Sequence, residues 1–178
     1  PSWGRPVTPI GPQTCIFTMV PAGARWQLVG VFDRAWVHPL AEAFGNLGSV
    51  HTLVVCSEDG LDEISIASDT HVSELRDGSI RDYVITPEQF GIARQSLDSL
   101  VVADAEDSFQ MIRSALNGEP GPASDMVALN AGATIYSADL ADSMEAGVER
   151  AKAILTSKAG VVKLDELCAY TQQFTEQD

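Results

Sequence analysis

The chain has 178 residues, of which 45% are hydrophobic and 20% charged, and its net charge is −14. This length suits one domain that buries about two thirds of its unfolded surface. The negative charge argues against nucleic acid as a partner, because affinity for DNA and RNA comes mainly from Lys and Arg contacts to phosphate. No apolar run approaches the roughly 18 to 20 residues that a membrane span needs, so a membrane role is not expected.

The cysteines and histidines indicate the compartment and argue against one kind of site. Cys15, Cys56 and Cys168 are odd in number and far apart. This pattern favours free thiols in a reducing compartment, and with no signal peptide in evidence we expect a cytoplasmic protein. The histidines show no metal-type spacing, which argues against a structural zinc site. They are His38, His51 and His71.

The first 25 residues hold five of the nine prolines, which predicts an irregular segment over residues 1–25. Residues 26–178 are expected to form a single α/β domain. Its first strand is the continuous apolar run WQLVGVF at 26–32, which is typical of a strand covered on both faces.

A helix is expected after this strand, with Asp33 as its N-cap. Pro39 predicts a break or a restart of the helix, because proline costs about 3 kcal/mol in a helix interior. Gly48 is expected just beyond the C-terminal end. One face of the helix would be formed by Trp36, Leu40, Phe44 and Leu47.

The next apolar run, HTLVVCS at 51–57, predicts a second strand buried on both faces. A helix between two such strands is the βαβ pattern, which makes the strands parallel with a right-handed crossover. Four carboxylates follow immediately, in SEDGLDE at 57–63. They should therefore lie at the C-terminal end of a parallel strand, the edge at which open α/β sheets bind ligands.

Residues 64–85 predict an antiparallel extension with one exposed face. Asp77 and Gly78 stand between two alternating runs, which is a strong signal for a two-residue hairpin turn. The TPEQF segment that follows fits a short capped turn, with Thr86 as N-cap, Pro87 at the first helical position and Gln89 at the third.

Helices are expected to dominate the rest of the chain. Asp107 should cap the first of them, and the EPGP segment should end it. Asp142 with Glu145 predicts the start of a later helix, the last one begins near residue 161, and the terminal TEQD frays. The fold class is therefore α/β, with a parallel-sheet core, an antiparallel hairpin extension and a helical C-terminal half. Inward-facing residues are expected at Phe109, Ile112, Leu116, Met126, Leu129, Ala133, Tyr136, Met144, Val148, Ala151, Leu155, Leu164, Leu167, Thr171 and Phe174.

The acidic run has two interpretations. In a protein of this charge such a run is usually a solvated surface, and we keep this interpretation for Glu58 and Asp59. Alternatively, a cation relieves the repulsion among the carboxylates. Nearby, Cys56 is interpreted as a buried, inert thiol and His71 as a surface residue of the hairpin. Asn130 is interpreted as a satisfied buried amide and not as a ligand contact.

Several consecutive segments resemble one enzyme family. They are, in order, QLVGVFD, PLAEAFGNLGS, LVVCSEDGLDEIS, HVSELRDG, ITPEQFGI and LNAGATIYSADLADSMEAGVERAKAIL. Over about residues 22–174 the chain is similar to the C-terminal part of bacterial anthranilate phosphoribosyltransferase. The resemblance implies the nucleoside phosphorylase/phosphoribosyltransferase class III fold, an α/β domain with an attached helical domain.

The resemblance also implies a reaction. In this family the amine of anthranilate takes the phosphoribosyl group of phosphoribosyl pyrophosphate (PRPP), early in tryptophan biosynthesis, and pyrophosphate leaves. Asp62 and Glu63 match the acidic pair that holds Mg²⁺ on the pyrophosphate in the family. Two carboxylates suit Mg²⁺, which keeps waters and phosphate oxygens as its other ligands. The resemblance assigns no catalytic side chain to this sequence.

The sequence departs from the family pattern in two ways. The glycine-rich pyrophosphate loop and the Lys-His-Gly-Asn segment of the family's N-terminal half are absent, so the chain alone is expected to be inactive or incomplete. The segment IGPQTCIFTMVPAGA also differs from the family's anthranilate loop. One alignment makes Gly11 and Pro12 substrate-binding residues of that loop, and the other loses the loop. A smaller departure is Cys56, where a histidine is expected.

Three functions stay open. The first is a phosphoribosyltransferase or its C-terminal portion, with PRPP and anthranilate as partners and Mg²⁺ as cofactor. The second is a non-catalytic α/β remnant or partner domain of the same fold. The third, a relative of pyrimidine nucleoside phosphorylase, fits the quoted segments less well. A homodimer also stays open, since the family commonly dimerises through its N-terminal helical region.

Overall fold

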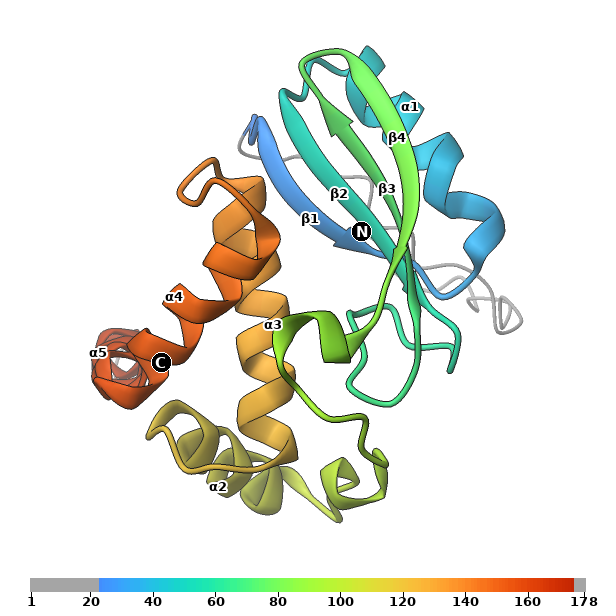
Figure 1. Cartoon of the computed structure of the whole chain (residues 1–178). Coiled ribbons are helices and arrows are strands. Elements are labelled where there is room, and N and C mark those ends of the chain that lie inside the picture. Colours follow the sequence, from blue (N-terminus) through green and yellow to red (C-terminus); the bar gives the residue numbers. More distant parts are fainter. Residues whose placement is uncertain (1–22, 175–178) are drawn as a thin grey trace, which may run out of the picture.

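The computed structural model describes residues 23–174. Within them the chain forms a four-stranded sheet with helices on both faces (Figure 1). Nearly all of the expected irregular segment, and the TEQD segment, lie outside the described residues, so the division at residue 26 stays a prediction. The strands, in the order in which they neighbour one another, are β1 (Trp26–Gly30), β2 (His51–Ser57), β3 (Thr70–Arg76) and β4 (Ser79–Ile85).

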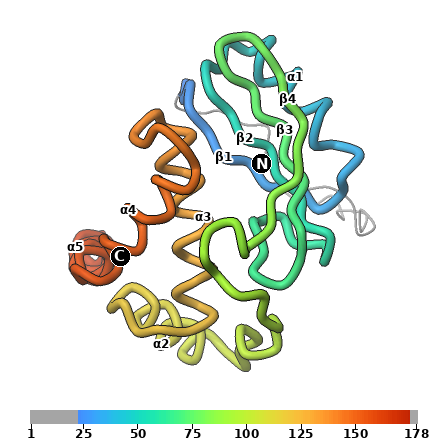
Figure 2. The backbone as a smooth tube through the Cα atoms, viewed as in Figure 1, coloured from blue at the N-terminus to red at the C-terminus, as the bar shows by residue number. Residues whose placement is uncertain are grey.

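Helices fill the connection between β1 and β2 and most of the chain after β4. Figure 2 shows the chain leaving the sheet, passing through α2, returning to the sheet along α3 and then running back along α4 beside α3 towards α5. Three of the helices in residues 23–174 are short 3-10 turns. The helices are η1 (Arg34–Trp36), α1 (Val37–Asn46), η2 (Pro87–Phe90), η3 (Asp98–Leu100), α2 (Ala105–Leu116), α3 (Pro122–Ser137), α4 (Met144–Thr156) and α5 (Ala159–Gln172).

The sheet is mixed. β1 and β2 are parallel, whereas β2 with β3 and β3 with β4 are antiparallel. This arrangement confirms the expected fold class, with the parallel part limited to one strand pair in the described residues. β2 is the central strand, and all seven of its residues are buried. Leu53 and Val55 enter the core shared with α3 and α4, while Val54 and Cys56 enter the core shared with α1.

β1 is less buried than expected. Among residues 23–174 it pairs only with β2, so it is an edge strand of the described sheet. Its middle residues are half-buried, and Trp26 is 45% exposed. The continuous apolar run therefore predicted the strand correctly, but the prediction of burial on both faces is wrong for the described residues.

The hairpin turn is confirmed, because Asp77 and Gly78 both have positive φ angles, 49° and 79°. The extension is shorter than expected, since its strand begins at Thr70 and residues 64–69 form bends and irregular structure. The reason is that the backbone of Ile64 bonds to a side chain of α3 and not to a neighbouring strand. The TPEQF turn is also confirmed as η2.

Two predicted helix caps are wrong by a few residues. The N-cap of α2 is Asp104, whose Oδ1 accepts a hydrogen bond from the Asp107 amide at 2.9 Å. The N-cap of α4 is Ser143, next to the expected Asp142. In each case several polar residues adjoin the start, and only the one that reaches a free amide of the first turn is the cap. Asp33 does cap η1, accepting from the Ala35 amide.

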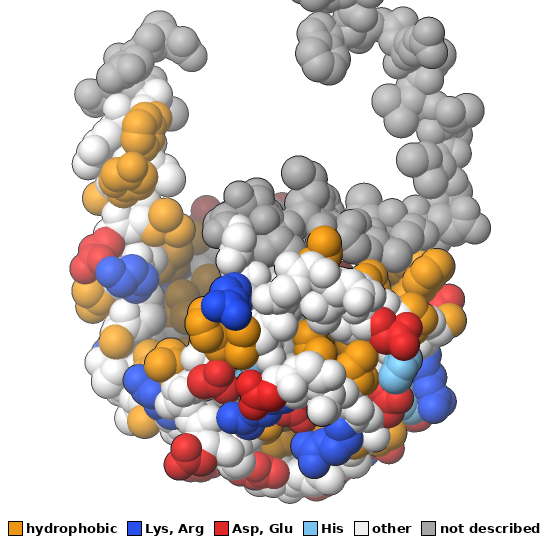
Figure 3. Space-filling model, turned by 90° about the horizontal axis from the view of Figure 1, so that it is seen from above, with side chains coloured by type: hydrophobic (Ala, Val, Ile, Leu, Met, Phe, Trp, Pro, Cys, Tyr) orange, Lys and Arg blue, Asp and Glu red, His pale blue; other side chains and the backbone are white. Residues whose placement is uncertain are grey.

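The apolar stripes of three helices differ from expectation. On α1 the buried face is Val37, Leu40, Ala41 and Phe44, with Trp36 and Leu47 exposed. Pro39 lies in the first turn of α1, just after η1 ends, where proline is tolerated. Ile112 of α2 is 46% exposed. No residue of α5 is buried, and Figure 3 shows hydrophobic side chains along this helix, the arm at the left.

The stripes of α3 and α4 are confirmed, and the two helices cross at glycines. Leu129, Ala133 and Tyr136 of α3 are buried, as are Met144 and Val148 of α4. At the crossing, a Cβ on Gly132 would lie 2.5 Å from the Val148 Cα, and a Cβ on Gly147 would lie 2.3 Å from the Gly132 carbonyl oxygen. Only glycine allows the backbones to approach this closely.

Gly132→Ala is expected to lower the free energy of unfolding by about 1 to 3 kcal/mol, because overpacking a tight contact forces the helices apart. Urea unfolding measures the loss. The control is Gly45→Ala in α1, whose new Cβ would meet only the Leu75 side chain at 3.3 Å. Equal stability of the two variants would show that the crossing is looser than the structure indicates.

A buried charged network joins the helices to the other end of the sheet. The side chain of His51, 0% exposed, lies between two carboxylates: Nδ1 is 2.9 Å from Asp139 Oδ1 and Nε2 is 3.2 Å from Glu74 Oε1. Tyr136 donates a 2.6 Å hydrogen bond to the same oxygen of Glu74. Arg81 donates to the second oxygen of Glu74 at 3.0 Å.

The network sets the protonation of its members. Burial opposes the charged forms of Glu74 and His51, but the hydrogen bonds and opposite charges of their partners outweigh this effect. Hydrogen bonds from His51, Tyr136 and Arg81 lower the pKa of Glu74 to about 2. The carboxylates of Glu74 and Asp139 raise the pKa of His51 above its ordinary value of 6.5. The network therefore favours the protonated imidazole, which can donate to both carboxylates.

The signs of these pKa shifts predict how stability depends on pH. The depressed pKa of Glu74 gives stability above pH 4.5 that is lost as the pH falls towards about 2. The raised pKa of His51 gives stability below pH 6.5 that is lost as the pH rises through the folded-state value. His51→Ala should remove this second decline and lower the free energy of unfolding by about 1.5 to 3 kcal/mol, the range for a hydrogen bond to a charged group, because the buried Glu74 loses one donor and keeps Tyr136 and Arg81.

Thermal unfolding between pH 2 and 9 measures both declines in stability. His38→Ala is the control, since His38 is exposed and its ion pair with Asp82 is 58% exposed on the carboxylate side. We expect its effect to stay below about 1 kcal/mol. A His51→Ala variant with the wild-type pH profile would contradict the charged state that the network assigns to His51.

Candidate functional site

The acidic segment 58–63 leaves the C-terminal end of β2 and leads to Ile64, which enters the core. Since β1 and β2 are parallel, their C-terminal residues Gly30 and Ser57 lie at the same edge of the sheet. Asp62 and Glu63 are both exposed. The structure therefore places the pair at the edge where the sequence predicts it, the edge at which open α/β sheets bind ligands.

Asp59 holds the loop in shape. Its Oδ1 accepts hydrogen bonds from the Ser57 hydroxyl and, at 3.2 Å, from the Leu61 amide, and its Oδ2 accepts from the Ser65 hydroxyl at 2.5 Å. Burial opposes the charged form, but these donors outweigh it and lower the pKa of Asp59. Both oxygens are occupied within the loop, which agrees with a structural interpretation of this residue.

The end of β1 fits against the loop only because it is a glycine. A Cβ on Gly30 would lie 1.4 Å from the backbone carbonyl oxygen of Asp62, a separation that two non-bonded atoms cannot adopt. The loop also returns to β2, where the Ser57 amide donates to the Leu61 carbonyl at 3.1 Å. The backbone of Asp62 is therefore set against the tip of β1.

Helix α3 holds the other side of the loop. The Asn130 Oδ1 accepts a hydrogen bond from the Ile64 amide at 2.9 Å, and its Nδ2 donates to the Ile64 carbonyl at 2.9 Å. The same Nδ2 donates to the Met126 carbonyl at 3.0 Å. The expectation that Asn130 is a satisfied amide is confirmed, and its main partner is the residue directly after the acidic pair.

The electrostatics of the pair fit a cation. Although the Glu63 side chain is exposed, neighbouring protein atoms displace part of its water, and this desolvation, followed by the negative charge of Asp62, raises the pKa of Glu63. In residues 23–174 there is no cluster of three or more His, Cys, Asp or Glu side chains that could hold a metal ion. The carboxylates of Asp62 and Glu63 are hard oxygen donors, which suit Mg²⁺ with water and phosphate oxygens better than they suit zinc.

Glu58 has a different partner. Its Oε1 lies 3.3 Å from Nε2 of His71, whose side chain is only 14% exposed. The expectation that His71 is a surface residue is therefore wrong. His71 pairs with Cys56 across the β2–β3 ladder, which brings it to the strand end that carries the loop.

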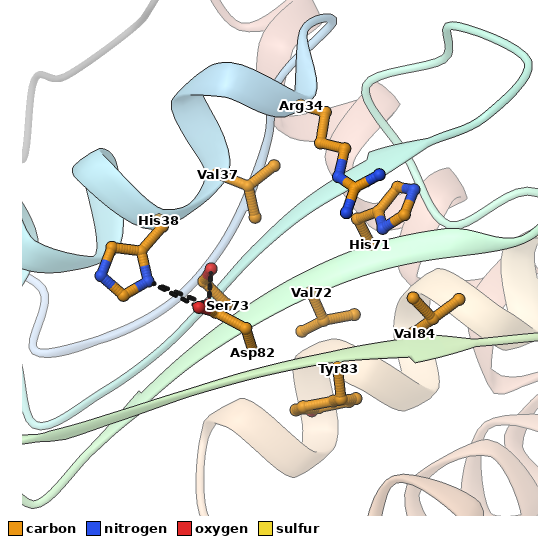
Figure 4. A pocket seen from close by; sticks show the side chains of 9 residues that line it. All are labelled: Arg34, Val37, His38, His71, Val72, Ser73, Asp82, Tyr83 and Val84. Atoms are coloured by element: carbon orange, nitrogen blue, oxygen red, sulfur yellow. Dashed lines mark hydrogen bonds and ion pairs between the residues drawn. The ribbon is translucent and has the colours of Figure 1, made fainter.

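A pocket of about 280 Å³ lies beside His71 on the α1 side of the sheet. In Figure 4 the side chains of Arg34 and His71 lie next to each other at one end of it, and His38 lies at the other. His38 Nδ1 is 2.8 Å from Asp82 Oδ2, and Ser73 donates to Asp82. The Asp77-Gly78 turn sets the register that places Ser73 opposite Asp82, so the contact between Ser73 and Asp82 could have been predicted from the sequence.

Three other residues were singled out in the sequence. Gly11 and Pro12 lie outside the described residues, so their role in substrate binding stays a prediction. Cys56 is buried, and burial raises the pKa of its thiol further than the nearby charges do. A thiol with a raised pKa is a poor nucleophile, which agrees with an inert cysteine.

The fold and the loop together define an α/β protein whose ligand edge lies at the carboxyl ends of its parallel strands. Residues 11–160 match the model of the glycosyl transferase family, a/b domain, and the chain belongs to this family. The α/β class III fold that the resemblance implied is thereby confirmed.

The chain is similar to named members of this family. It is 53% identical over 154 residues to anthranilate phosphoribosyltransferase from Methylococcus capsulatus, covering 86% of this chain and 45% of that protein. It is 52% identical over 158 residues to the enzyme of that name from Chromohalobacter salexigens, covering 89% of this chain and 46% of the relative. The chain therefore spans less than half the length of these relatives.

Solved structures show the same fold. The crystal structure of anthranilate phosphoribosyltransferase from Thermus thermophilus matches with a TM-score of 0.77 and 37% identity, over 85% of this chain and 45% of that one. The enzyme from Saccharomyces cerevisiae in complex with PRPP and Mg matches with a TM-score of 0.68. At 20% identity, over 78% of this chain and 41% of that one, it supports the fold alone.

Gly30→Ala should displace the acidic loop, because the new methyl group would occupy the position of the Asp62 carbonyl oxygen. We expect a loss of about 1 to 3 kcal/mol or more in the free energy of unfolding. Amide chemical shifts of residues 59–64 should change, while those of the Asp77-Gly78 turn should not. Unchanged shifts in the loop would mean that β1 does not set its position.

Proposed function

We propose that this chain provides the metal-binding side of a site that transfers the phosphoribosyl group of PRPP to anthranilate, in tryptophan biosynthesis. The observation that carries the proposal is the acidic pair, exposed at the ligand edge of a chain that is 53% identical to an enzyme of that name. The choice of PRPP and Mg²⁺ comes from the family resemblance of the acidic pair, and the S. cerevisiae protein of the same fold was solved with these two ligands.

Asp62 and Glu63 would hold the Mg²⁺ ion. Their carboxylate oxygens are the hard donors that Mg²⁺ prefers, and two carboxylates leave room for phosphate oxygens and water. When bound, the metal neutralises negative charge on the departing pyrophosphate.

Other residues around the loop hold the Asp62 and Glu63 carboxylates in place before the cation binds. Asp59 closes the loop on itself, and Gly30 lets its backbone rest against β1. A cation site that is already ordered loses little conformational freedom when the ligand arrives, which favours binding and orients the diphosphate.

The anthranilate side of the site is proposed for Gly11 and Pro12. The family match begins at residue 11 and includes both residues. The other alignment, which loses the anthranilate loop, matches CIFTMV to the strand before it and gives Gly11 and Pro12 no such role. The isolated chain is not expected to catalyse turnover, because its sequence contains neither the glycine-rich pyrophosphate loop nor the Lys-His-Gly-Asn segment of the family.

A second candidate function also fits a sequence without these two family segments. A stable α/β domain that binds a partner without turnover would also lack those segments. Turnover by the isolated chain would exclude this alternative, and Mg²⁺-dependent binding of PRPP would favour the enzyme-derived site.

We also propose the cellular compartment of the protein. Cys56 and Cys168 are free, which supports a reducing compartment, and we place the protein in the cytoplasm. No helix in residues 23–174 is long and apolar enough to cross a membrane. A homodimer and the lack of nucleic-acid binding stay predictions.

Calorimetric titration with PRPP in the presence of Mg²⁺ tests the acidic pair. Asp62→Asn and Glu63→Gln should each weaken binding by roughly tenfold or more, since even outer partners of metal ligands contribute that much. Glu58→Gln is the control, because it removes the same charge from the same loop but Glu58 pairs with His71. Equal affinities in all four proteins, or no Mg²⁺-dependent binding by the wild type, would overturn the metal role.

A further inference from the structure

We propose that Asn130 of α3 is a positioning residue that fixes the acidic pair for its cation by clamping the backbone of Ile64. The inference rests on the proposed function, because the clamp matters for binding only if Asp62 and Glu63 hold the metal. Asn130 acts through Ile64, since its side-chain amide bonds to backbone groups and not to either carboxylate.

The geometry uses the whole side-chain amide. Oδ1 accepts from the Ile64 amide at 2.9 Å, and Nδ2 donates to the Ile64 carbonyl at 2.9 Å and the Met126 carbonyl at 3.0 Å. One acceptor and two donors are therefore engaged, which only a carboxamide offers at this length. Asp cannot donate, and Leu can do neither.

The clamp acts where the loop would otherwise be free to move. Asp62 is set against β1 through the close approach to Gly30, whereas Glu63 is the next residue along and its side chain is exposed. Two neighbouring carboxylates repel each other and favour an open loop. Fixing both peptide groups of Ile64, whose side chain is 2% exposed, holds the end of the acidic segment against that repulsion.

Helix α3 is a rigid support for the clamp. Asn130 follows the buried Leu129 and precedes Gly132 at the close crossing with α4. The Thr134 hydroxyl also donates to the Asn130 carbonyl at 2.8 Å. Movement of the clamp would require movement of a helix that is packed on both the sheet and α4, so the helical half of the chain determines where the loop ends.

The test compares Asn130→Ala with Gln95→Ala. Gln95 also attaches a loop to α3 through a side-chain amide, donating to Asp125 Oδ2 at 2.8 Å. Its backbone amide donates to the Ile66 carbonyl at 3.0 Å, a contact that the substitution retains, so Gln95→Ala removes a bond to α3 without removing one to Ile64. Two measurements are made on the full chain: hydrogen exchange at the Ile64 amide by NMR, and calorimetric titration with inorganic pyrophosphate and Mg²⁺. Asn130→Ser is measured as well, as a polar and less disruptive variant should Asn130→Ala not fold.

The positioning role predicts that exchange at the Ile64 amide rises at least tenfold in the Asn130 variants and that their affinity for Mg²⁺ and pyrophosphate falls by roughly 10 to 100-fold. Gln95→Ala should lose a similar amount of thermal stability and keep the wild-type affinity. A purely structural role of Asn130 would instead give both substitutions the same small effect on affinity.

Two results separate the possible failures. If Asp62→Asn loses binding while the folded Asn130 variants keep wild-type affinity or wild-type exchange at Ile64, the positioning role is wrong and the proposed function stands. If wild type and Asp62→Asn bind equally, the proposed function is wrong, and the positioning role is lost with it.

Discussion

The structure depends on how the acidic segment is held between a strand and a helix. Gly30 allows the backbone of Asp62 to touch the tip of β1, and the side chain of Asn130 ties the backbone of Ile64 to α3. Two like charges are thereby kept adjacent on an ordered loop. Such an arrangement costs electrostatic energy unless a cation is shared, which connects the fold to the proposed chemistry.

The two ends of β2 have different roles. At its N-terminal end, the buried His51 lies between Glu74 and Asp139, and this network attaches the end of α3 to the sheet. At its C-terminal end the strand leads into the loop that presents Asp62 and Glu63. One helix, α3, therefore contacts both ends, through Tyr136 at the first and Asn130 at the second.

Local patterns predicted much of this fold. The apolar run of β2, the Asp77-Gly78 turn and the stripes of α3 and α4 each follow from periodicity or turn chemistry, and all are confirmed. The edge where Asp62 and Glu63 lie followed from the order strand, helix, strand.

What the sequence could not predict depends on distant partners. His51 and Asp139 are separated by 88 positions, and no local pattern reveals their contact. Residues 64–69 alternate as a strand would, but the α3 side chain that binds the Ile64 backbone prevents a ladder there. The apolar residues of α5 have the spacing of a buried stripe, yet they are not buried. Spacing alone does not show whether another element covers a stripe. The metal role of the acidic pair came from resemblance and stays a proposal.

The most direct test of the account is a crystal structure of the chain soaked with Mn²⁺ and pyrophosphate, read from the anomalous signal of the metal. We predict one peak bridging the carboxylates of Asp62 and Glu63 and the diphosphate oxygens, with the Asn130 contacts to Ile64 retained. An ordered loop with no metal at either carboxylate, or a metal bound elsewhere on the chain, would contradict the account.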